Sequence, residues 1–337
     1  MKPKLSICIP TYNRAKFLTE CLDSVLPQVK SKDEVEVIVI DNASPDDTQA
    51  IVERYIAYYD CLKYYRNEKN LGYAGNQVKC IEYASGEYMA LLCDDDIYTD
   101  GQVERILKVL SEREYAFVAL NYYGFLEKGS KPYKSNFAPE KDVVFDRAYD
   151  ILNYPTVGHF SGLIFNTRLA KDTLQRILAK RSYQSFEKGR GIIDDVAVRS
   201  TLASNLPAYF IGKRGLANRM PSKVDYDNLY HLCLDYYEYY KNLFDEGLIS
   251  KNDLDYRGRA VIDRLPRAII SNGSTLNKGE VKRITDQLCK WFKGNKKFDK
   301  ICFPLLCSLK YRVVREIYQI AVNNYRLAKP IWYRFNS

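Results

Sequence analysis

Strand-like and helix-like segments alternate through the first 120 residues, and this alternation limits the fold more than any other feature of the sequence. Short apolar runs such as Val35–Ile40 are typical of strands buried on both faces. Between them, apolar residues recur at helical spacing. The alternation predicts an α/β fold with a mostly parallel sheet flanked by helices, and ligands then bind at the carboxyl ends of the strands. The expected strands are Leu5–Ile9, Val35–Ile40, Leu62–Tyr65 and Tyr88–Leu92, with helices at about 74–83 and 102–112.

The periodicity changes twice further along the chain. From 121 to 225 it is looser, with short strands expected at Gly162–Phe165 and Tyr209–Ile211. From about 226 onward the apolar residues follow helical spacing. We therefore expect two halves of one domain, 1–120 and 121–225, followed by a helical C-terminal region, 226–337.

Basic residues are concentrated at the C-terminal end. The whole chain carries a formal charge of +9, whereas residues 281–337 hold 13 Lys or Arg and 3 acids, which gives +10 for that stretch alone. Lysines and arginines mixed with aromatic residues suit the surface of an anionic membrane, although a solvated helical surface explains them equally well. No recognition motif for nucleic acid accompanies the patch, so we expect no nucleic-acid partner.

The cysteines indicate a reducing compartment. Nine cysteines occur without a CxxC pair, and the two histidines lie far apart, which argues against a structural zinc site. Cys8 and Cys93 lie in strand-like runs, where a thiol packs as a small hydrophobic group. The longest C-terminal apolar stretch is far shorter than the roughly 20 residues of a membrane span. We expect a cytoplasmic protein, soluble or peripheral on the inner face of the cytoplasmic membrane.

Three consecutive carboxylates, Asp94, Asp95 and Asp96, follow the strand expected at Tyr88–Leu92. Like charges this close repel each other unless a cation or hydrogen bonds compensate them. One explanation is a cluster at a helix N-terminus, because a helix is expected after Gly101. The other is a Mg²⁺-type cation held by carboxylates and substrate phosphates.

Four motifs in order give the chain a family resemblance: ICIPTYNR (7–14), VIVIDNASPDDT (37–48), NLGYAGN (70–76) and LLCDDDIYTDG (91–101). Together they resemble the nucleotide-sugar domain of family 2 glycosyltransferases, over about residues 3 to 200. Within the family, the chain is most similar to the abequosyltransferase-like enzymes of bacterial surface polysaccharide assembly. The resemblance implies a GT-A fold, which is Rossmann-like with a mostly parallel sheet and flanking helices. The half 1–120 would then bind the nucleotide sugar, and 121–225 would bind the acceptor.

The resemblance also implies the donor-binding residues. Asp41 would accept a hydrogen bond from the base, although an Asx turn ahead of Pro45 is an alternative. Asp94 would touch the ribose, while Asp95 and Asp96 would hold Mn²⁺ or Mg²⁺. Many relatives have an acid where this chain has Cys93, which leaves open which two aspartates act as the DxD pair. The remaining expected donor contacts are Pro10, Thr11, Tyr12 and Arg14 in the nucleotide pocket, and Asn70, Gly72 and Asn76 bordering the donor, where a plain turn before a helix is the alternative.

A second acidic pair, Asp194 and Asp195, follows about 100 residues later. It resembles the family's Glu-Asp pair at the start of a helix, whose second member is the general base, and this implies that role for Asp195 with Asp194 beside it. Two acids capping a helix are the structural alternative. The segment with His159, Ser161 and Gly162 resembles the acceptor floor. Further on, Lys213, Arg214, Asn218 and Arg219 would clamp a diphosphate or form a solvated basic loop.

The sequence therefore predicts a metal-dependent transferase. It would move a sugar from a nucleotide diphosphate sugar to a glycan or a polyprenyl-diphosphate-linked glycan, as in O-antigen or capsule synthesis, with inversion. Two alternatives stay open. A sugar-nucleotide nucleotidyltransferase would carry a Gly-rich loop after its first strand, where this chain has PTYNR. A non-catalytic carbohydrate- or membrane-binding protein would not need the intact acids at Asp41, Asp94–Asp96 and Asp195.

Overall fold

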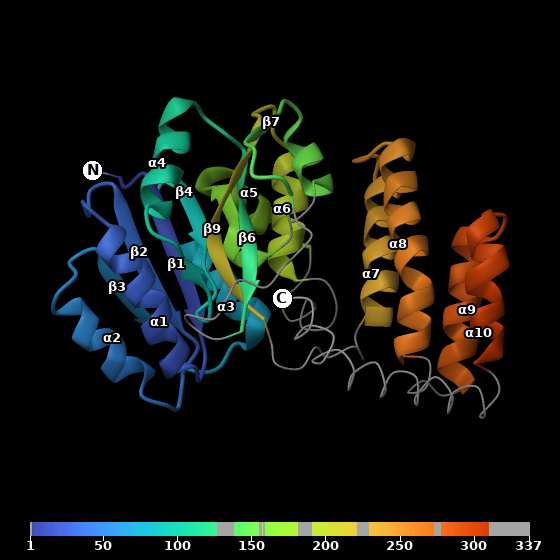
Figure 1. Cartoon of the computed structure of the whole chain (residues 1–337), viewed down its shortest axis with the longest axis horizontal. Coiled ribbons are helices and arrows are strands. Elements are labelled where there is room, and N and C mark those ends of the chain that lie inside the picture. Colours follow the sequence, from blue (N-terminus) through green and yellow to red (C-terminus); the bar gives the residue numbers. More distant parts are fainter. Residues whose placement is uncertain are drawn as a thin grey trace, which may run out of the picture. The chain divides into compact units, whose positions relative to one another are not determined.

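The computed structural model describes residues 2–126, 138–154, 157, 159–180, 191–220, 229–272 and 278–309. The chain separates into two compact units, residues 1–222 and residues 223–337. Unit 1 combines a sheet with helices, and unit 2 is helical wherever it is described, apart from short connections (Figure 1). The α/β class expected from the sequence is confirmed, and the described part of the C-terminal region, 229–272 and 278–309, is helical as expected.

The sheet of unit 1 has a parallel side and a mixed side. Over the described residues it has nine strands in the order β3-β2-β1-β4-β8-β6-β9-β5, with β7 paired to β9. The first four strands are parallel and correspond to the four expected from the sequence: β3 (Leu62–Arg66), β2 (Val35–Asp41), β1 (Leu5–Thr11) and β4 (Tyr88–Leu91).

The mixed side begins where β8 (Leu163–Asn166) runs antiparallel to both β4 and β6 (Phe117–Phe125). The long strand β9 (Ala208–Arg219) then lies parallel to β6, and the two short strands β5 (Ile97–Tyr98) and β7 (Val143–Phe145) pair with it in antiparallel fashion. This pairing returns the C-terminal end of β9 to the segment that follows β4.

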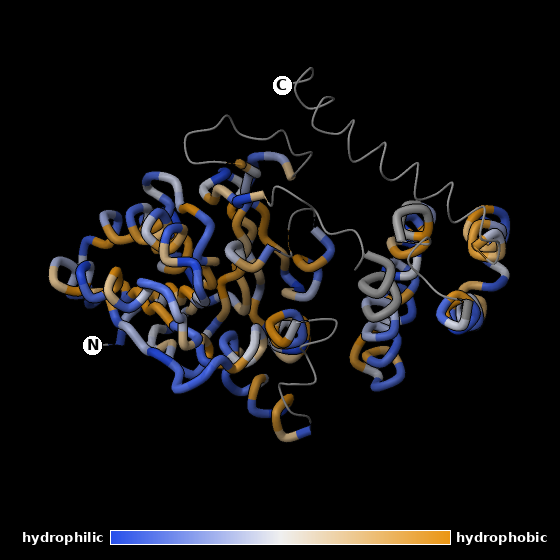
Figure 2. Tube along the Cα trace, turned by 90° about the horizontal axis from the view of Figure 1, so that it is seen from below, coloured by the Kyte–Doolittle hydropathy of each residue, from blue (hydrophilic) through white to orange (hydrophobic). Residues whose placement is uncertain are grey.

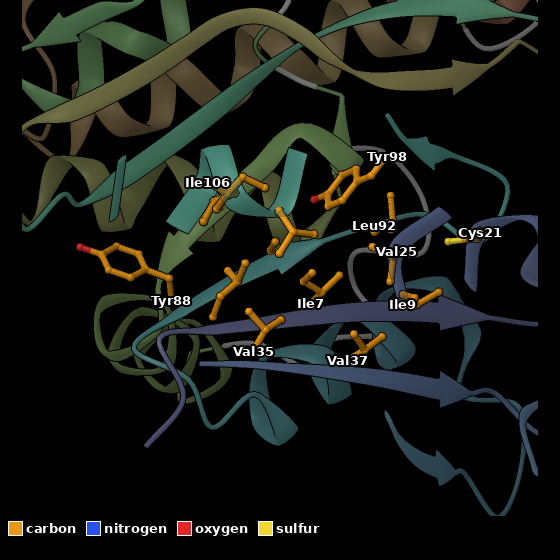
Figure 3. Close-up of a cluster of buried hydrophobic side chains, with 14 of the residues drawn as sticks. Ile7, Ile9, Cys21, Val25, Val35, Val37, Tyr88, Leu92, Tyr98 and Ile106 are labelled. Atoms are coloured by element: carbon orange, nitrogen blue, oxygen red, sulfur yellow. The ribbon is translucent and has the colours of Figure 1, made fainter. Parts of the chain in front are cut away.

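Helices flank the sheet of unit 1 because the central strands are apolar on both faces. In β1, Ile7 and Ile9 pack into one buried cluster with Val35 and Val37 of β2 (Figure 3), while Cys8 belongs to a second cluster. Figure 2 shows the apolar segments gathered inside this unit and hydrophilic turns outside. The flanking helices are α1 (Ala15–Val25), α2 (Thr48–Ile56), α3 (Gly72–Tyr83), α4 (Gln102–Glu112), α5 (Thr167–Leu178) and α6 (Ile192–Leu202), with short 3₁₀ turns η1 (Leu26–Gln28), η2 (Ala148–Asn153) and η3 (Phe160–Gly162).

Unit 2 contains α7 (Leu229–Asp245), α8 (Lys251–Asn272), α9 (Lys278–Phe292), a π-helical turn η5 (Phe298–Cys302) and α10 (Phe303–Ser308). Its interior is formed by fully buried side chains such as Leu243, Leu265, Leu288 and Phe298. Of the helices described, none is both long and apolar enough to span a membrane. The basic and aromatic residues from Arg312 to Phe335 lie outside the described residues.

Strand register brings the sequence motifs to one edge of the sheet. Thr11 at the end of β1 is paired with Asp41 at the end of β2, and Asp41 is paired with Arg66 at the end of β3. Cys8 is paired with Leu91 at the end of β4, directly before the acidic cluster. The carboxyl ends of the four parallel strands therefore face the same side, as expected for a ligand-binding edge.

Candidate functional site

Asp41 is held at the end of β2 by three partners. Its side chain is fully buried, and it accepts hydrogen bonds from the Tyr64 hydroxyl at 2.6 Å, from the Arg66 guanidinium and from the backbone N–H of Ser44 at 2.8 Å. The Ser44 contact spans three residues, one more than in the Asx turn that was the alternative for Asp41. Tyr64 and Arg66 are contacts that sequence reasoning missed, although both point from β3 toward the neighbouring strand end.

A network of asparagines fixes the loop that leads into α3. Asn42 donates to Asn70 at 2.9 Å and to the carbonyl of Gly72 at 3.1 Å, and it accepts from Asn67 at 3.0 Å. Asn67 also donates to Asn76, whose own amide donates to a carbonyl of β2. Gly72 has a φ of 75°, a conformation that other residues rarely adopt. The residues expected to border the donor, Asn70, Gly72 and Asn76, thus hold this loop against β2.

The ends of β1 and β4 are joined through Asp94 and Asp95. Asp94 is almost fully buried and accepts from the Thr11 hydroxyl at 2.7 Å and from Arg14 at 3.2 Å. The same guanidinium group lies 2.8 Å from Asp95. Burial raises the pKa of Asp94 to about 6, and burial together with Asp96 raises the pKa of Asp95. Pro10, the last residue but one of β1, is paired with Ile40, and Tyr12, which follows the strand, is 44% exposed.

Asp96 connects the acidic cluster with the mixed side of the sheet. Its side chain is fully buried and accepts from His159 at 2.7 Å, from the hydroxyl of Ser161, from Asn218 at 3.1 Å and from the backbone N–H of Arg219 at 2.8 Å. Four donors from two distant segments therefore balance this buried charge, which would otherwise be strongly unfavourable.

Arg219 supports the acidic cluster through a contact with its backbone. Its guanidinium group donates to the carbonyl of Asp95 at 3.0 Å and pairs with Glu20 at 2.6 Å. It also lies between the rings of Phe17 and Phe125, at 4.9 and 4.6 Å from their centres, with 10% of its side chain exposed. Arg219 is thus buried and engaged by protein groups, whereas Arg14, with 49% of its side chain exposed, is open to a ligand.

The acidic cluster has a donor set that fits a hard divalent cation. The thiol of Cys93 and the carboxylates of Asp95 and Asp96 offer atoms that lie within 4.8 Å of one another. Burial raises the pKa of the Cys93 thiol well above its ordinary value, so it stays protonated and is a poor ligand. Of the two carboxylates, Asp95 is the accessible one, whereas each oxygen of Asp96 already accepts two hydrogen bonds. Carboxylate oxygens are the ligands that Mg²⁺ and Mn²⁺ prefer.

The second acidic pair lies in the first turn of α6, as expected. Asp195 is fully buried, and Arg199 one turn later donates to it at 2.8 Å. Asp194 is partly exposed and lies close enough to influence the hydroxyl of Tyr73 on α3. The start of α6 therefore faces the start of α3, and α3 follows directly on the loop that contains Asn70 and Gly72.

The expected acceptor residues differ in their exposure. Ser161 is fully buried and donates to Asp96, and it also accepts from the backbone N–H of Cys93 at 2.8 Å. Gly162 is buried as well, beside Leu120. The side chain of His159 is 21% exposed, with the ring of Tyr122 5.1 Å away. Of these three residues, only His159 presents a side chain toward solvent.

Residues 6–170 match the family model described as glycosyl transferase family 2. Similar curated proteins include the putative teichuronic acid biosynthesis glycosyltransferase TuaG of Bacillus subtilis, 32% identical over 147 residues, which are 44% of this chain and 57% of that protein. Another is the abequosyltransferase RfbV of Salmonella typhimurium, 37% identical over 93 residues, which are 27% of this chain and 28% of that protein. The chain spans between 41% and 57% of the length of the first curated relatives it matches.

Two similar solved structures cover nearly the whole chain. S. aureus TarS 1-349 in complex with UDP has a TM-score of 0.62 and 21% identity, over 94% of this chain and 92% of that one. The mannosyltransferase PcManGT from Pyrobaculum calidifontis, in complex with GDP-Man and Mn²⁺, has a TM-score of 0.55 and 14% identity, over 97% of this chain and 88% of that one. At these identities the likeness establishes the GT-A fold.

Proposed function

We propose that this chain is a glycosyltransferase, like the family whose model matches residues 6–170, and that it transfers a sugar from a nucleotide diphosphate sugar to a glycan or a polyprenyl-diphosphate-linked glycan. The reaction would serve bacterial surface polysaccharide synthesis; the relative TuaG is named as a putative glycosyltransferase of teichuronic acid biosynthesis. One observation carries the proposal. Thr11, Asp41 and the Asp94–Asp96 cluster meet at one edge of the sheet, where the register of four parallel strands places them together.

The nucleotide would lie along the ends of β1 and β2. Oδ1 of Asp41 accepts one hydrogen bond, from Ser44, and a carboxylate oxygen has room for another from a base N–H. Tyr12 offers an exposed ring beside Pro10 and Thr11, and Asp94 would contact the ribose. The exposed guanidinium of Arg14 would bind the diphosphate, since its fork of donors matches phosphate oxygens.

Asp95 and Asp96 would hold Mn²⁺ or Mg²⁺, which neutralises the charge of a leaving diphosphate. Asp95 is the more accessible of the two, while Asp96 is fixed by its four donors. Asp95 is already paired with one cationic group, because the Arg14 guanidinium lies 2.8 Å from its carboxylate.

Asp195 would act as the general base. An acceptor hydroxyl would attack the anomeric carbon, the bond to the diphosphate would break, and the hydroxyl proton would pass to the Asp195 carboxylate. Attack from the side opposite the leaving group inverts the anomeric centre. Arg199 holds one oxygen of this carboxylate at 2.8 Å and fixes its direction. Asp194 and His159 would contact the acceptor, and Ser161 and Gly162 would support that surface from below.

The test is a calorimetric titration of UDP, GDP and CDP, each with and without Mn²⁺. We expect one nucleotide to bind in a Mn²⁺-dependent way, and Asp95→Asn to remove that dependence. Asp100→Asn is the matched control, because Asp100 is an exposed acid a few residues further on. If none of the three nucleotides binds, the proposal is wrong and a non-catalytic protein remains. Formation of a sugar nucleotide from a nucleoside triphosphate and a sugar phosphate would instead show a nucleotidyltransferase.

We also propose that unit 2 carries a membrane-binding patch, defined by Ile301, Phe303, Lys293, Lys296 and Lys300. Ile301 and Phe303 are 44% and 39% exposed, and the three lysines are exposed. Apolar side chains among lysines suit an anionic lipid surface, where each cation adds about 1 kcal/mol. A protein bound in this way would work on the inner face of the cytoplasmic membrane and meet a polyprenyl-linked acceptor there.

A further inference from the structure

Gln77 on α3 has a buried side-chain oxygen without a hydrogen-bond partner in the part of the chain that the structure describes. The residue is 2% exposed, and its Oε1 lies out of contact with solvent without a hydrogen-bond partner among the described residues. The hydroxyl of Tyr73, one turn earlier on the same helix, lies close to this side chain. Buried polar atoms in native proteins nearly always have a partner, so an unpaired one needs an explanation.

The unpaired oxygen lies at the start of α6, next to the proposed base. The position that a Cβ of Gly191 would take is 3.8 Å from Gln77 Oε1, 3.7 Å from Asp194 Oδ2 and 3.7 Å from the Phe160 ring. Asp195 lies in the same first turn of α6. An amide, a carboxylate and an aromatic ring therefore gather around one point, and this is the kind of surface that binds the hydroxyls and the apolar face of a sugar.

The place of Gln77 favours the transferred sugar over the acceptor. The neighbouring residue Asn76 is hydrogen-bonded to β2 and to Asn67, in the loop expected to border the nucleotide sugar. Helix α3 therefore lies on the side of the site that would bind the nucleotide sugar. The facing helix α6 carries the proposed base, which must lie near the anomeric carbon. A group between the two helices would contact the sugar ring that is being transferred.

We propose that Gln77 Oε1 accepts a hydrogen bond from a hydroxyl of the transferred sugar and so selects among donor sugars. The proposal rests on the function proposed above. The Tyr73 ring is 54% exposed and lies edge-on to Phe160 at 6.0 Å. A hydroxyl of the sugar would approach Oε1 from the side of Gly191, Asp194 and Phe160. The hydroxyl then fills the vacant acceptor position, while Phe160 contacts the sugar ring.

A structural role and a role in sugar recognition predict different effects of replacing Gln77 on stability and on sugar-nucleotide affinity. An unpaired buried oxygen carries a desolvation cost, and an apolar side chain of similar shape removes that cost. Gln77→Leu and Gln77→Met should therefore keep or raise the thermal unfolding midpoint. If Gln77 serves the sugar, the same variants should lose affinity for sugar nucleotides.

The experiment compares each nucleoside diphosphate with its sugar conjugates by calorimetry: UDP, UDP-glucose, UDP-galactose, UDP-N-acetylglucosamine, GDP and GDP-mannose, all with Mn²⁺. We expect Gln77→Leu and Gln77→Met to weaken binding of the preferred sugar nucleotide about tenfold, the size of one hydrogen bond. Binding of the parent diphosphate should not change. Gln49→Leu on the exposed face of α2 makes the same substitution away from the site and should leave both affinities unchanged.

The outcomes separate this proposal from the function it rests on. If no nucleotide binds to the wild type, the transferase function fails. If nucleotides bind and the ratio of sugar-nucleotide to diphosphate affinity is the same in both Gln77 variants, the sugar contact is wrong. The same holds if the variants change only the KM for the acceptor.

Discussion

His159 Nε2 lies 2.7 Å from Asp96 Oδ2, although 63 positions separate the two residues in the chain. The pair connects the acidic cluster after β4 with the segment before β8. Ser161, Asn218 and Arg219 add three more donors to the same carboxylate. Asp96 therefore fixes where the cluster stands relative to the surface proposed for the acceptor.

Removing the charge of Asp96 should destabilise unit 1. In Asp96→Asn, one carboxylate oxygen becomes an amide that faces N–H donors, so buried donors lose their acceptor. We expect the free energy of unfolding to fall by about 2–3 kcal/mol, measured by urea denaturation. Asp100→Asn, at an exposed acid nearby, should change it by less than about 0.5 kcal/mol. Equal effects in the two variants would contradict the role of Asp96.

Replacing Asp94 by Asn should stabilise the protein more at neutral pH than at acidic pH. Its pKa is raised from 3.8 to about 6 by burial, so between these values the folded protein binds more protons than the unfolded chain. The contribution of Asp94 to stability is therefore greatest at low pH and is lost as the pH rises through this window. Asp94→Asn should gain about 2 kcal/mol more over wild type at pH 7.5 than at pH 4.5. Urea denaturation at the two pH values measures this, and a gain independent of pH would show that the pKa of Asp94 is ordinary.

Asp195→Asn should stop transfer without stopping donor binding. A general base contributes about 10²- to 10⁴-fold to the rate, so we expect kcat to fall by that factor. The dissociation constant for the donor should stay within about twofold, and single-turnover assays with calorimetry measure the two effects. Asp172→Asn on the exposed side of α5 is the control and should retain full activity. A kcat within about threefold of wild type in Asp195→Asn would rule out this base and, with it, the argument for inversion.

The membrane-binding patch predicts selective binding to anionic vesicles. The chain should sediment with phosphatidylglycerol vesicles more than with phosphatidylcholine vesicles, and salt should weaken the binding. The double variant Ile301→Ser with Phe303→Ser should reduce binding about tenfold, since two half-exposed apolar side chains are lost. Tyr58→Ser replaces an 85% exposed ring in unit 1 and serves as the control. Equal binding of wild type and double variant would show that unit 2 docks by another surface or not at all.

The sequence by itself determined the parallel side of the sheet and the strand ends that carry the motifs. Strand and helix periods are local, so the run Val35–Ile40 and the helical stripe of Leu18, Cys21, Leu22 and Val25 are recognisable without the rest of the chain. All of these residues are buried in the structure. The motifs then fall at one edge because parallel strands share their carboxyl ends.

Only the tertiary structure decided which distant side chains meet at that edge. The order in which β8, β6 and β9 join the sheet brings His159, Asn218 and Arg219 to the acidic cluster, and strand order has no local signature in the sequence. Arg219 was interpretable from sequence as a diphosphate clamp or as part of a solvated loop, yet burial between two rings makes it a support for Asp95. The unpaired oxygen of Gln77 likewise exists only because α3 and α6 face each other, since satisfaction of a buried polar group depends on every segment packed around it.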